Sequence, residues 1–290
     1  MSWLIAGTVP RADFPLVRGQ YELRGSELLV AGQSVKVARG TPALLAAAAA
    51  AARVLGIPPL ETILAGDTGK GEGSRQLYAE LAANPPPVPI AGLTFHYLLP
   101  DIYWHNQVLW GLEALLPKPF LVADAGFMYA AKMSGFAASY DLFTPDVGEM
   151  AFLADERAPH PFYTRGFLLQ DEERVPEQIA RAYAEENAAR HLLVKGRKDY
   201  VVAAGQIVAE ISAPNVPAME PIGGTGDTLT GLVTALLAAG MQPVPACQVA
   251  ARANRYLGFY AEPTPAHGVA DLLAFLPRAL EQALKEAGVG

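Results

Sequence analysis

Cysteine is nearly missing from this sequence of 290 residues, which contains Cys247 alone. A single cysteine cannot form an internal disulfide, and no cysteine or histidine stands near it at a metal-ligand spacing. The sequence therefore predicts a protein of a reducing, cytoplasmic compartment, in which Cys247 is a small core residue.

Basic clusters and long hydrophobic runs are also missing. Lys and Arg number 22 against 29 Asp and Glu, the formal net charge is −7, and the basic residues are scattered. This distribution argues against nucleic acid or a membrane as partner. The start of the chain lacks the basic region of a signal peptide, and the longest apolar run, Pro42–Gly56, is shorter than the roughly 20 residues of a membrane span. We expect this run to form a buried helix.

What the sequence does contain is an alternation of strands and helices. Short β-rich segments occupy residues 1–40, and apolar strands then alternate with helices, which predicts an α/β fold with a mostly parallel sheet covered on both faces. A hairpin turning at residues 204–206 is expected to add antiparallel strands at one edge. We expect one domain over residues 1–290, with residues 1–40 as an edge or lid. Helices are expected at 42–56, 74–83, 104–116, 177–189, 226–239, 244–261 and 269–286.

The segment "PIGGTGDTLTG", residues 221–231, is the most informative stretch. Gly223, Gly224 and Gly226 carry no Cβ to hold a phosphate away, and consecutive N–H groups at a helix start bind anions. Thr225 can add a hydroxyl or cap the helix. Asp227 is a poor phosphate ligand but a suitable base for a hydroxyl that attacks phosphate. The alternative is a plain turn with an acid at a helix N-terminus.

Four segments resemble the ribokinase-like superfamily, in particular its ADP- or ATP-dependent NAD(P)H-hydrate dehydratases. They are "GGTGDTLTG", "FTPDVGEMAFL", "LLVKG" and "HGVADLLAFLPRAL", and the resemblance covers roughly residues 120–284. It implies a three-layer αβα sandwich, with Asp227 as base and Gly224–Gly226 as anion hole. It also implies that Glu149 acts near magnesium, that Lys195 and Gly196 lie beside the nucleotide, and that Asn254 lines its adenine side. Glu149 as an ordinary helix acid, and Lys195 as a solvent lysine, remain open alternatives.

The first half departs from the family pattern, and this puts the acceptor substrate in question. The family's Asp-Ala-Asp is Asp124-Ala125-Gly126 here, its histidine in the Thr-Pro segment is Asp146, and its glycine-rich tyrosine segment has no counterpart. Two other segments are candidates for contacting an acceptor: the glycine loop with Asp67 and Arg75, and the aromatic segment with His96. A surface turn and core packing are the respective alternatives. Asp124, His96, Asp67 and Arg75 are the expected substrate residues.

Three functions remain open. The leading hypothesis is magnesium- and nucleotide-dependent phosphoryl transfer from ATP or ADP to a small hydroxyl compound, most specifically hydrated NADH or NADPH. The second is a kinase for a sugar, a hydroxymethylpyrimidine or a hydroxyethylthiazole. The third is a nucleotide-binding sensor without turnover. A homo-oligomer is compatible with each of these.

Overall fold

The computed structural model describes residues 2–87, 89–155 and 172–288. A single twisted sheet has the strand order β11-β10-β9-β8-β7-β6-β1-β5-β2-β3-β4. The strands from β9 to β5 are parallel, and antiparallel strands extend both edges. The strands are β1 (Ser2–Val9), β2 (Val17–Arg24), β3 (Glu27–Val30), β4 (Gln33–Lys36), β5 (Glu61–Gly66), β6 (Ile90–His96), β7 (Phe120–Ala123), β8 (Leu142–Phe143), β9 (His191–Val194), β10 (Asp199–Ala203) and β11 (Gln206–Ile211).

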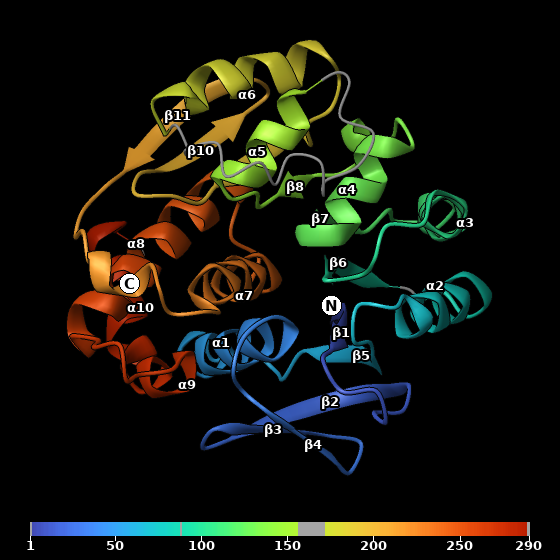
Figure 1. Cartoon of the computed structure of the whole chain (residues 1–290), viewed down its shortest axis with the longest axis horizontal. Helices are drawn as coiled ribbons and strands as arrows, with labels where there is room; N and C mark the ends of the chain where they lie inside the picture. The colour runs from blue at the N-terminus through green and yellow to red at the C-terminus, as the bar shows by residue number, and fades with distance from the viewer. Residues whose placement is uncertain (1, 88, 156–171, 289–290) are drawn as a thin grey trace.

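Helices cover both faces of the sheet, which confirms the predicted three-layer α/β architecture (Figure 1). One face is covered by α1 (Thr41–Leu55), α7 (Thr225–Ala238), α8 (Pro243–Ala261), α9 (Val269–Leu272) and α10 (Leu276–Glu286). The other face is covered by α2 (Glu72–Ala83), α3 (Ile102–Glu113), α4 (Ala125–Met133), α5 (Val147–Ala154) and α6 (Val175–Ala184). Among the helices of the described ranges, none is long and apolar enough to cross a membrane.

Two expectations from the sequence were wrong. The segment 1–40 does not lie wholly at an edge, because β1 is buried along nearly its whole length and pairs with β5 and β6 in the middle of the sheet. Only β2, β3 and β4 form the antiparallel edge. The helix expected over 269–286 is interrupted by a 3₁₀ turn (Leu273–Phe275), and a separate helix begins at Leu276 with Pro277 in its first turn, a position that tolerates proline whereas a helix interior does not.

Small residues bring α1 and α7 into very close contact. The sequence predicts the limits of α1 to within a residue, since the helix begins at Thr41 with Pro42 in its first turn and ends at Gly56 in the left-handed conformation. A Cβ added to Gly231 of α7 would lie 2.2 Å from the backbone oxygen of Leu44 in α1, so only glycine allows this approach. The pairing fixes the N-termini of both helices beside each other at one end of the sheet, where the candidate site lies.

Candidate functional site

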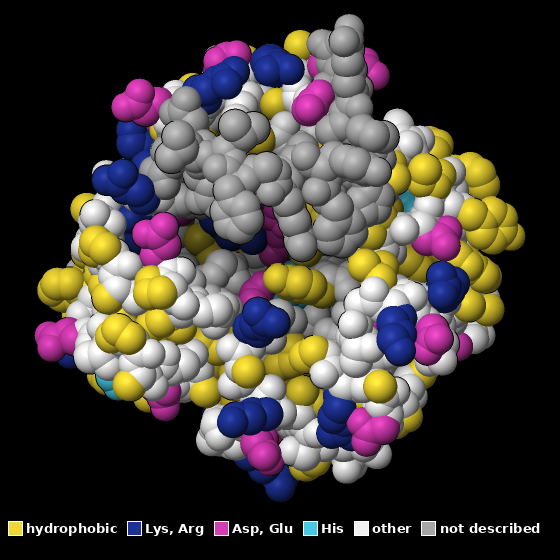
Figure 2. Space-filling model, in the orientation of Figure 1, with side chains coloured by type: hydrophobic (Ala, Val, Ile, Leu, Met, Phe, Trp, Pro, Cys, Tyr) yellow, Lys and Arg dark blue, Asp and Glu magenta, His cyan; other side chains and the backbone are white. Residues whose placement is uncertain are grey.

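The candidate site lies where the carboxyl ends of β1, β6 and β7 meet the N-termini of α1, α4 and α7. Ligands of open α/β sheets bind at this edge. Figure 2 shows acidic and basic side chains gathered around a hollow near the centre of this view. In Figure 1 this point corresponds to the ends of β1 and β6 next to α7.

The glycine loop leads directly into α7. Gly224 has φ 102°, a left-handed conformation that favours glycine. A Cβ there would lie 3.1 Å from the side chain of Val269 and 3.2 Å from the Cα of Arg39, so the loop is also tightly packed. Thr225 is the first residue of α7, and its hydroxyl donates to the Ile222 oxygen at 3.1 Å rather than pointing to a ligand.

Asp227, in the first turn of α7, is 9% exposed and has two close partners. Its Oδ2 accepts the Gly40 N–H at 2.6 Å, and its Oδ1 lies 3.1 Å from His96 Nε2. Burial raises the pKa of Asp227, but the hydrogen bond and charge of His96, the charge of Lys195 and the Gly40 N–H together lower that pKa below its ordinary value. The carboxylate is therefore ionised at neutral pH, as a general base must be.

His96 is completely buried, at the end of β6. Its Nδ1 lies 3.0 Å from the Thr41 hydroxyl, and its Nε2 lies 3.6 Å from Asp124 Oδ2 in addition to the contact with Asp227. The sequence predicted a substrate contact for His96. In the structure its ring is enclosed by protein groups, and its Nε2 faces Asp227.

Asp124 and Lys195 form a second buried pair beside the first. Lys195 Nζ lies 3.0 Å and 3.1 Å from the Asp124 oxygens, which also accept the Thr230 hydroxyl and the Ala125 N–H. Burial alone would lower the pKa of Lys195, but Asp124 and Glu149 raise it above its ordinary value. A Cβ on Gly226 would be 3.9 Å from Nζ, so this fixed cation lies alongside the glycine loop.

Glu149 lies in the first turn of α5 and is half-buried. It forms a capping box with Asp146, and its Oε1 accepts the Tyr129 hydroxyl at 2.9 Å. Burial raises the pKa of Glu149 to about 8, with further contributions from Asp146 and Asp124. Asp146, which departs from the family's histidine, is thus the helix cap.

A complete protein cage for a metal is not found in the described part of the chain, since no group of three or more His, Cys, Asp or Glu residues could hold an ion. Magnesium commonly needs only one or two carboxylates, because phosphates and waters fill its other positions. The Glu149 carboxylate fits that requirement, because it is half-buried and each of its oxygens has one protein partner, whereas both oxygens of Asp124 are held by Lys195, Thr230 and Ala125.

The predicted nucleotide residues Gly196 and Asn254 have structural partners. The Gly196 N–H donates to Asp199, and its oxygen accepts Arg255, while Arg255 and Asp199 form a buried ion pair at 2.8 Å. Asn254 joins α8 to α7, because it accepts the Thr228 hydroxyl at 2.6 Å and donates to the Thr225 oxygen. The Asp199–Arg255 pair was missed by sequence reasoning, since the two residues are far apart in the chain.

Asp67 and Arg75 belong to the loop between β5 and α2, at the same edge of the sheet. Both Asp67 oxygens are occupied: Oδ1 accepts the N–H groups of residues 69–71, and Oδ2 accepts both the N–H and the hydroxyl of Ser74. Asp67 therefore holds the loop together and does not point to a substrate. Arg75 is exposed, so its guanidinium remains available to a ligand.

Arg39 and Tyr97 complete the rim, and neither was among the predicted site residues. Arg39 is exposed, and its side chain passes within 3.6 Å of the position of a Cβ on Gly223. Tyr97 has a left-handed backbone (φ 54°), is 51% exposed, and packs edge-on against the His96 ring at 4.6 Å. Its left-handed conformation, rare for a tyrosine, is the kind of local strain that gathers at functional sites.

The parallel sheet, the glycine loop and the acid in the next helical turn define a protein of the ribokinase-like class. A ribokinase-like superfamily protein of Enterococcus faecalis matches with a TM-score of 0.56 at 14% identity, covering 97% of this chain and 87% of its own. Bacillus subtilis YxkO also gives a TM-score of 0.56, at 16% identity, covering 97% and 92% of the two chains. These similarities establish the fold.

Sequence comparison identifies the family. Residues 102–275 match the carbohydrate-kinase family of NAD(P)H-hydrate dehydratases, and the chain belongs to this family. The uncharacterized protein MJ1337 of Methanocaldococcus jannaschii is 37% identical over 227 residues, 78% of this chain and 93% of that protein. The bifunctional NAD(P)H-hydrate repair enzyme Nnr of Hyperthermus butylicus is 40% identical over 120 residues, 39% of this chain and 22% of that enzyme.

Proposed function

We propose that this protein transfers a phosphoryl group from ATP or ADP to the hydroxyl of hydrated NADH or NADPH, and so restores the nicotinamide. The observation that carries this proposal is the position of Asp227, which lies in the first turn of α7 directly after a glycine loop flanked by Lys195 and is held by the Gly40 N–H and His96. A base, an anion-binding loop and a fixed cation are what phosphoryl transfer to a hydroxyl requires.

In this mechanism Asp227 accepts the proton of the substrate hydroxyl while the hydroxyl oxygen forms a bond to the terminal phosphorus of the nucleotide. The bond from that phosphorus to the bridging oxygen breaks, and the shortened nucleotide leaves. The N–H groups of the loop at Gly224–Gly226 and the Lys195 ammonium stabilise charge on the transferred group. The carbon–oxygen bond of the phosphoester then breaks, and loss of phosphate and a ring proton restores the double bond.

Glu149 would hold magnesium, which when bound neutralises phosphate charge. His96 acts through Asp227: its Nε2 fixes one carboxylate oxygen, the Gly40 N–H fixes the other, and the remaining lone pairs face the substrate. His96 is thus a positioning residue in this proposal.

A kinase that releases a stable phosphoester is the second candidate. Residues 102–275 match the family, whereas Gly40, Thr41, His96 and Tyr97, which surround Asp227, precede that match. The side of the site that faces an acceptor is therefore built largely outside the family's pattern, which leaves room for a different alcohol.

The test mixes the purified protein with hydrated NADH, magnesium, and ATP or ADP, and follows the absorbance of reduced nicotinamide. Nucleotide-dependent recovery is expected, and Asp227→Ala should slow it by about 10²–10⁴-fold. Glu281→Gln, an exposed change on α10, is the control and should retain full activity. Full activity of Asp227→Ala contradicts the assigned base. No recovery, together with phosphoester formation on a pyrimidine, thiazole or sugar alcohol, favours the kinase.

A further inference from the structure

Two exposed arginines lie at the rim of the candidate site. Arg39 immediately precedes Gly40, whose N–H donates to Asp227, and Arg75 lies near the start of α2. Among the residues that the structure describes, neither arginine side chain has an ion pair or a hydrogen bond. A guanidinium with free donors suits a phosphate group, because its planar fork matches the phosphate oxygens in pairs.

Both arginine side chains pack on glycines. The Cβ and Cδ of Arg39 lie 3.8 Å and 3.6 Å from the position of a Cβ on Gly223, so this stem lies against the loop that leads into α7. Nη1 of Arg75 lies 3.5 Å from the position of a Cβ on Gly71. Side chains that are already held lose less freedom when a ligand binds. The packing therefore prepares both guanidinium groups for an anion.

The segment that follows β6 connects the two arginines. A Cβ on Gly40 would lie 4.0 Å from the Tyr97 ring, and a Cβ on Gly71 would lie 3.5 Å from the Leu99 side chain. Tyr97 itself is 51% exposed. One arginine thus lies near each end of the short segment 97–99, and the exposed Tyr97 ring belongs to the same rim.

The charges around Asp227 favour an acceptor that brings its own anion to this rim. Asp227 is ionised, so it repels a negatively charged acceptor unless cations lie nearby. The Lys195 ammonium is already held by Asp124 and lies alongside the glycine loop. Arg39 and Arg75 are unpaired, and they can offset this repulsion on the side of the acceptor.

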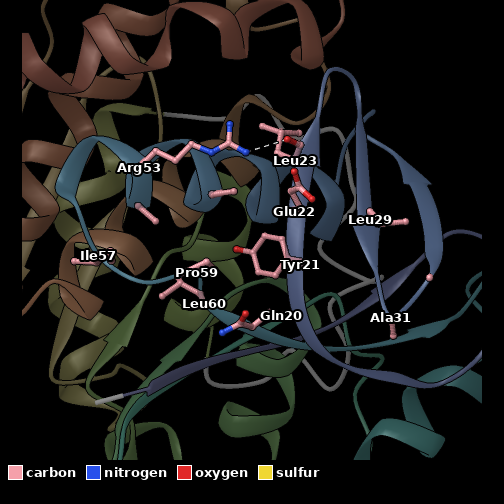
Figure 3. Close-up of a pocket in the computed structure, with 13 residues that line it drawn as sticks. Gln20, Tyr21, Glu22, Leu23, Leu29, Ala31, Arg53, Ile57, Pro59 and Leu60 are labelled. Atoms are coloured by element: carbon pink, nitrogen blue, oxygen red, sulfur yellow. Dashed lines mark hydrogen bonds between the residues drawn. The ribbon is translucent and has the colours of Figure 1, made fainter.

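A pocket elsewhere in the molecule lacks these properties. It has a volume of about 440 Å³ and lies between the C-terminal half of α1 and the β2–β3 hairpin (Figure 3). Arg53, the one cation among its lining residues, donates to the Leu23 oxygen at 3.0 Å, and Glu22 lines the same pocket. This pocket therefore offers less to an anion than the rim beside Asp227.

We propose that Arg39 and Arg75 bind a phosphate group of the acceptor, while the Tyr97 ring packs against its sugar or its base. The protein then acts on a phosphorylated alcohol, such as a nucleotide, and discriminates against the free heterocycle or sugar. All three residues precede the segment 102–275 that matches the family. The inference rests on the proposed function, because it takes Asp227 as the base that the acceptor hydroxyl approaches.

The experiment measures binding by calorimetry, without turnover, for two pairs of probes. One pair is reduced nicotinamide mononucleotide and reduced nicotinamide riboside, and the other is ribose 5-phosphate and ribose. Wild-type protein should bind at least one phosphorylated probe at least tenfold more tightly than its dephosphorylated counterpart. Arg39→Met and Arg75→Met keep an apolar stem, and each should reduce this preference at least fivefold while ATP affinity stays unchanged. Arg39→Lys and Arg75→Lys, which keep the charge, should recover part of it.

Arg190→Met is the matched control. Arg190 is exposed and directly precedes β9, so it lies at the amino end of a parallel strand, whereas the candidate site lies at the carboxyl ends. This change removes the same charge from the protein and should leave the preference for phosphorylated probes at its wild-type value.

The absence of a preference for either phosphorylated probe overturns the proposal, and so does a full preference retained by either methionine variant. An equal loss of ATP affinity in these variants also overturns it, because the arginines then serve the donor nucleotide. Failure of the proposed function gives a different result: nicotinamide is not recovered, but the preference and its loss in the variants persist. That result supports a phosphorylated acceptor and favours the kinase.

Discussion

Replacement of His96 by phenylalanine is the most direct test of how the site holds Asp227, the base that we propose. Phe fills similar space but removes the contact of 3.1 Å with Asp227 Oδ1 and the contact of 3.0 Å with the Thr41 hydroxyl. A buried hydrogen bond to a charged group contributes about 1.5–3 kcal/mol, so we expect a loss of that order in the free energy of unfolding.

The effect on rate follows from the freedom that Asp227 gains. With only the Gly40 N–H to hold it, the carboxylate can turn away from the hydroxyl, and misplacement of a reacting group by about 1 Å costs up to roughly 10²-fold. We therefore expect kcat to fall by about ten- to a hundredfold with KM little changed. His96→Gln places a donor near the position of Nε2 and should recover part of the activity.

The pH profile distinguishes this role from a purely structural one. His96 is a main cause of the lowered pKa of Asp227, so its removal raises that pKa and moves the acidic limb of the kcat profile to higher pH. The stability that Asp227 contributes is present above its unfolded pKa and is lost as pH falls through its folded pKa; in His96→Phe this loss begins at higher pH. An unmoved acidic limb with unchanged kcat would refute the reasoning.

Three further predictions test other parts of the structure. Gly231→Ala must push α1 and α7 apart and should lower the free energy of unfolding, measured by chemical denaturation, by about 1–3 kcal/mol. Gly111→Ala, which meets open space within α3, is the control and should leave stability unchanged or raise it, so equal effects of the two changes would contradict the packing argument. The pKa of Glu149 is raised on folding, so the free energy of unfolding of the wild-type protein should fall as pH rises from about 4.5 to about 8. Glu149→Gln keeps the capping box and should remove this decline, and identical pH–stability curves for the two proteins would contradict the raised pKa. Asp67→Ala leaves the N–H groups of its loop without their acceptor and should cost about 2 kcal/mol in thermal or urea unfolding, with nucleotide affinity unchanged; a neutral substitution would contradict the structural role.

The sequence predicted individual helices and hairpins better than it predicted which strands lie next to one another in the sheet. The apolar run after Pro42 and the glycine at its end define α1 through chain-local chemistry, and the hairpin at 204–206 is found between β10 and β11. The position of β1 in the centre of the sheet depends on pairing with strands far along the chain, which a short apolar run does not encode.

The same limit applies to the site. The glycine loop and Asp227 are adjacent in sequence and were found as a motif, whereas His96 reaches Asp227 from 131 residues away. Asp67 illustrates a different limit, since an acid in a glycine-rich loop can bind a ligand or its own backbone, and only the geometry of its five hydrogen bonds decides.

The division of the site along the chain has a consequence for how such a protein can diversify. Asp227, its loop and Lys195 lie in the stretch of the chain from α3 onward, whereas Gly40, His96 and Tyr97 lie in the stretch before α3. At the site the two stretches meet through the contact of α1 with α7 and through the hydrogen bonds of Gly40 and His96 to Asp227, and elsewhere they share the sheet pairing of β6 with β7. If Asp227 is the base that we propose, substitutions in the earlier stretch can change which hydroxyl compound approaches it while the glycine loop and Lys195 stay constant, so that donor chemistry and acceptor choice can evolve separately.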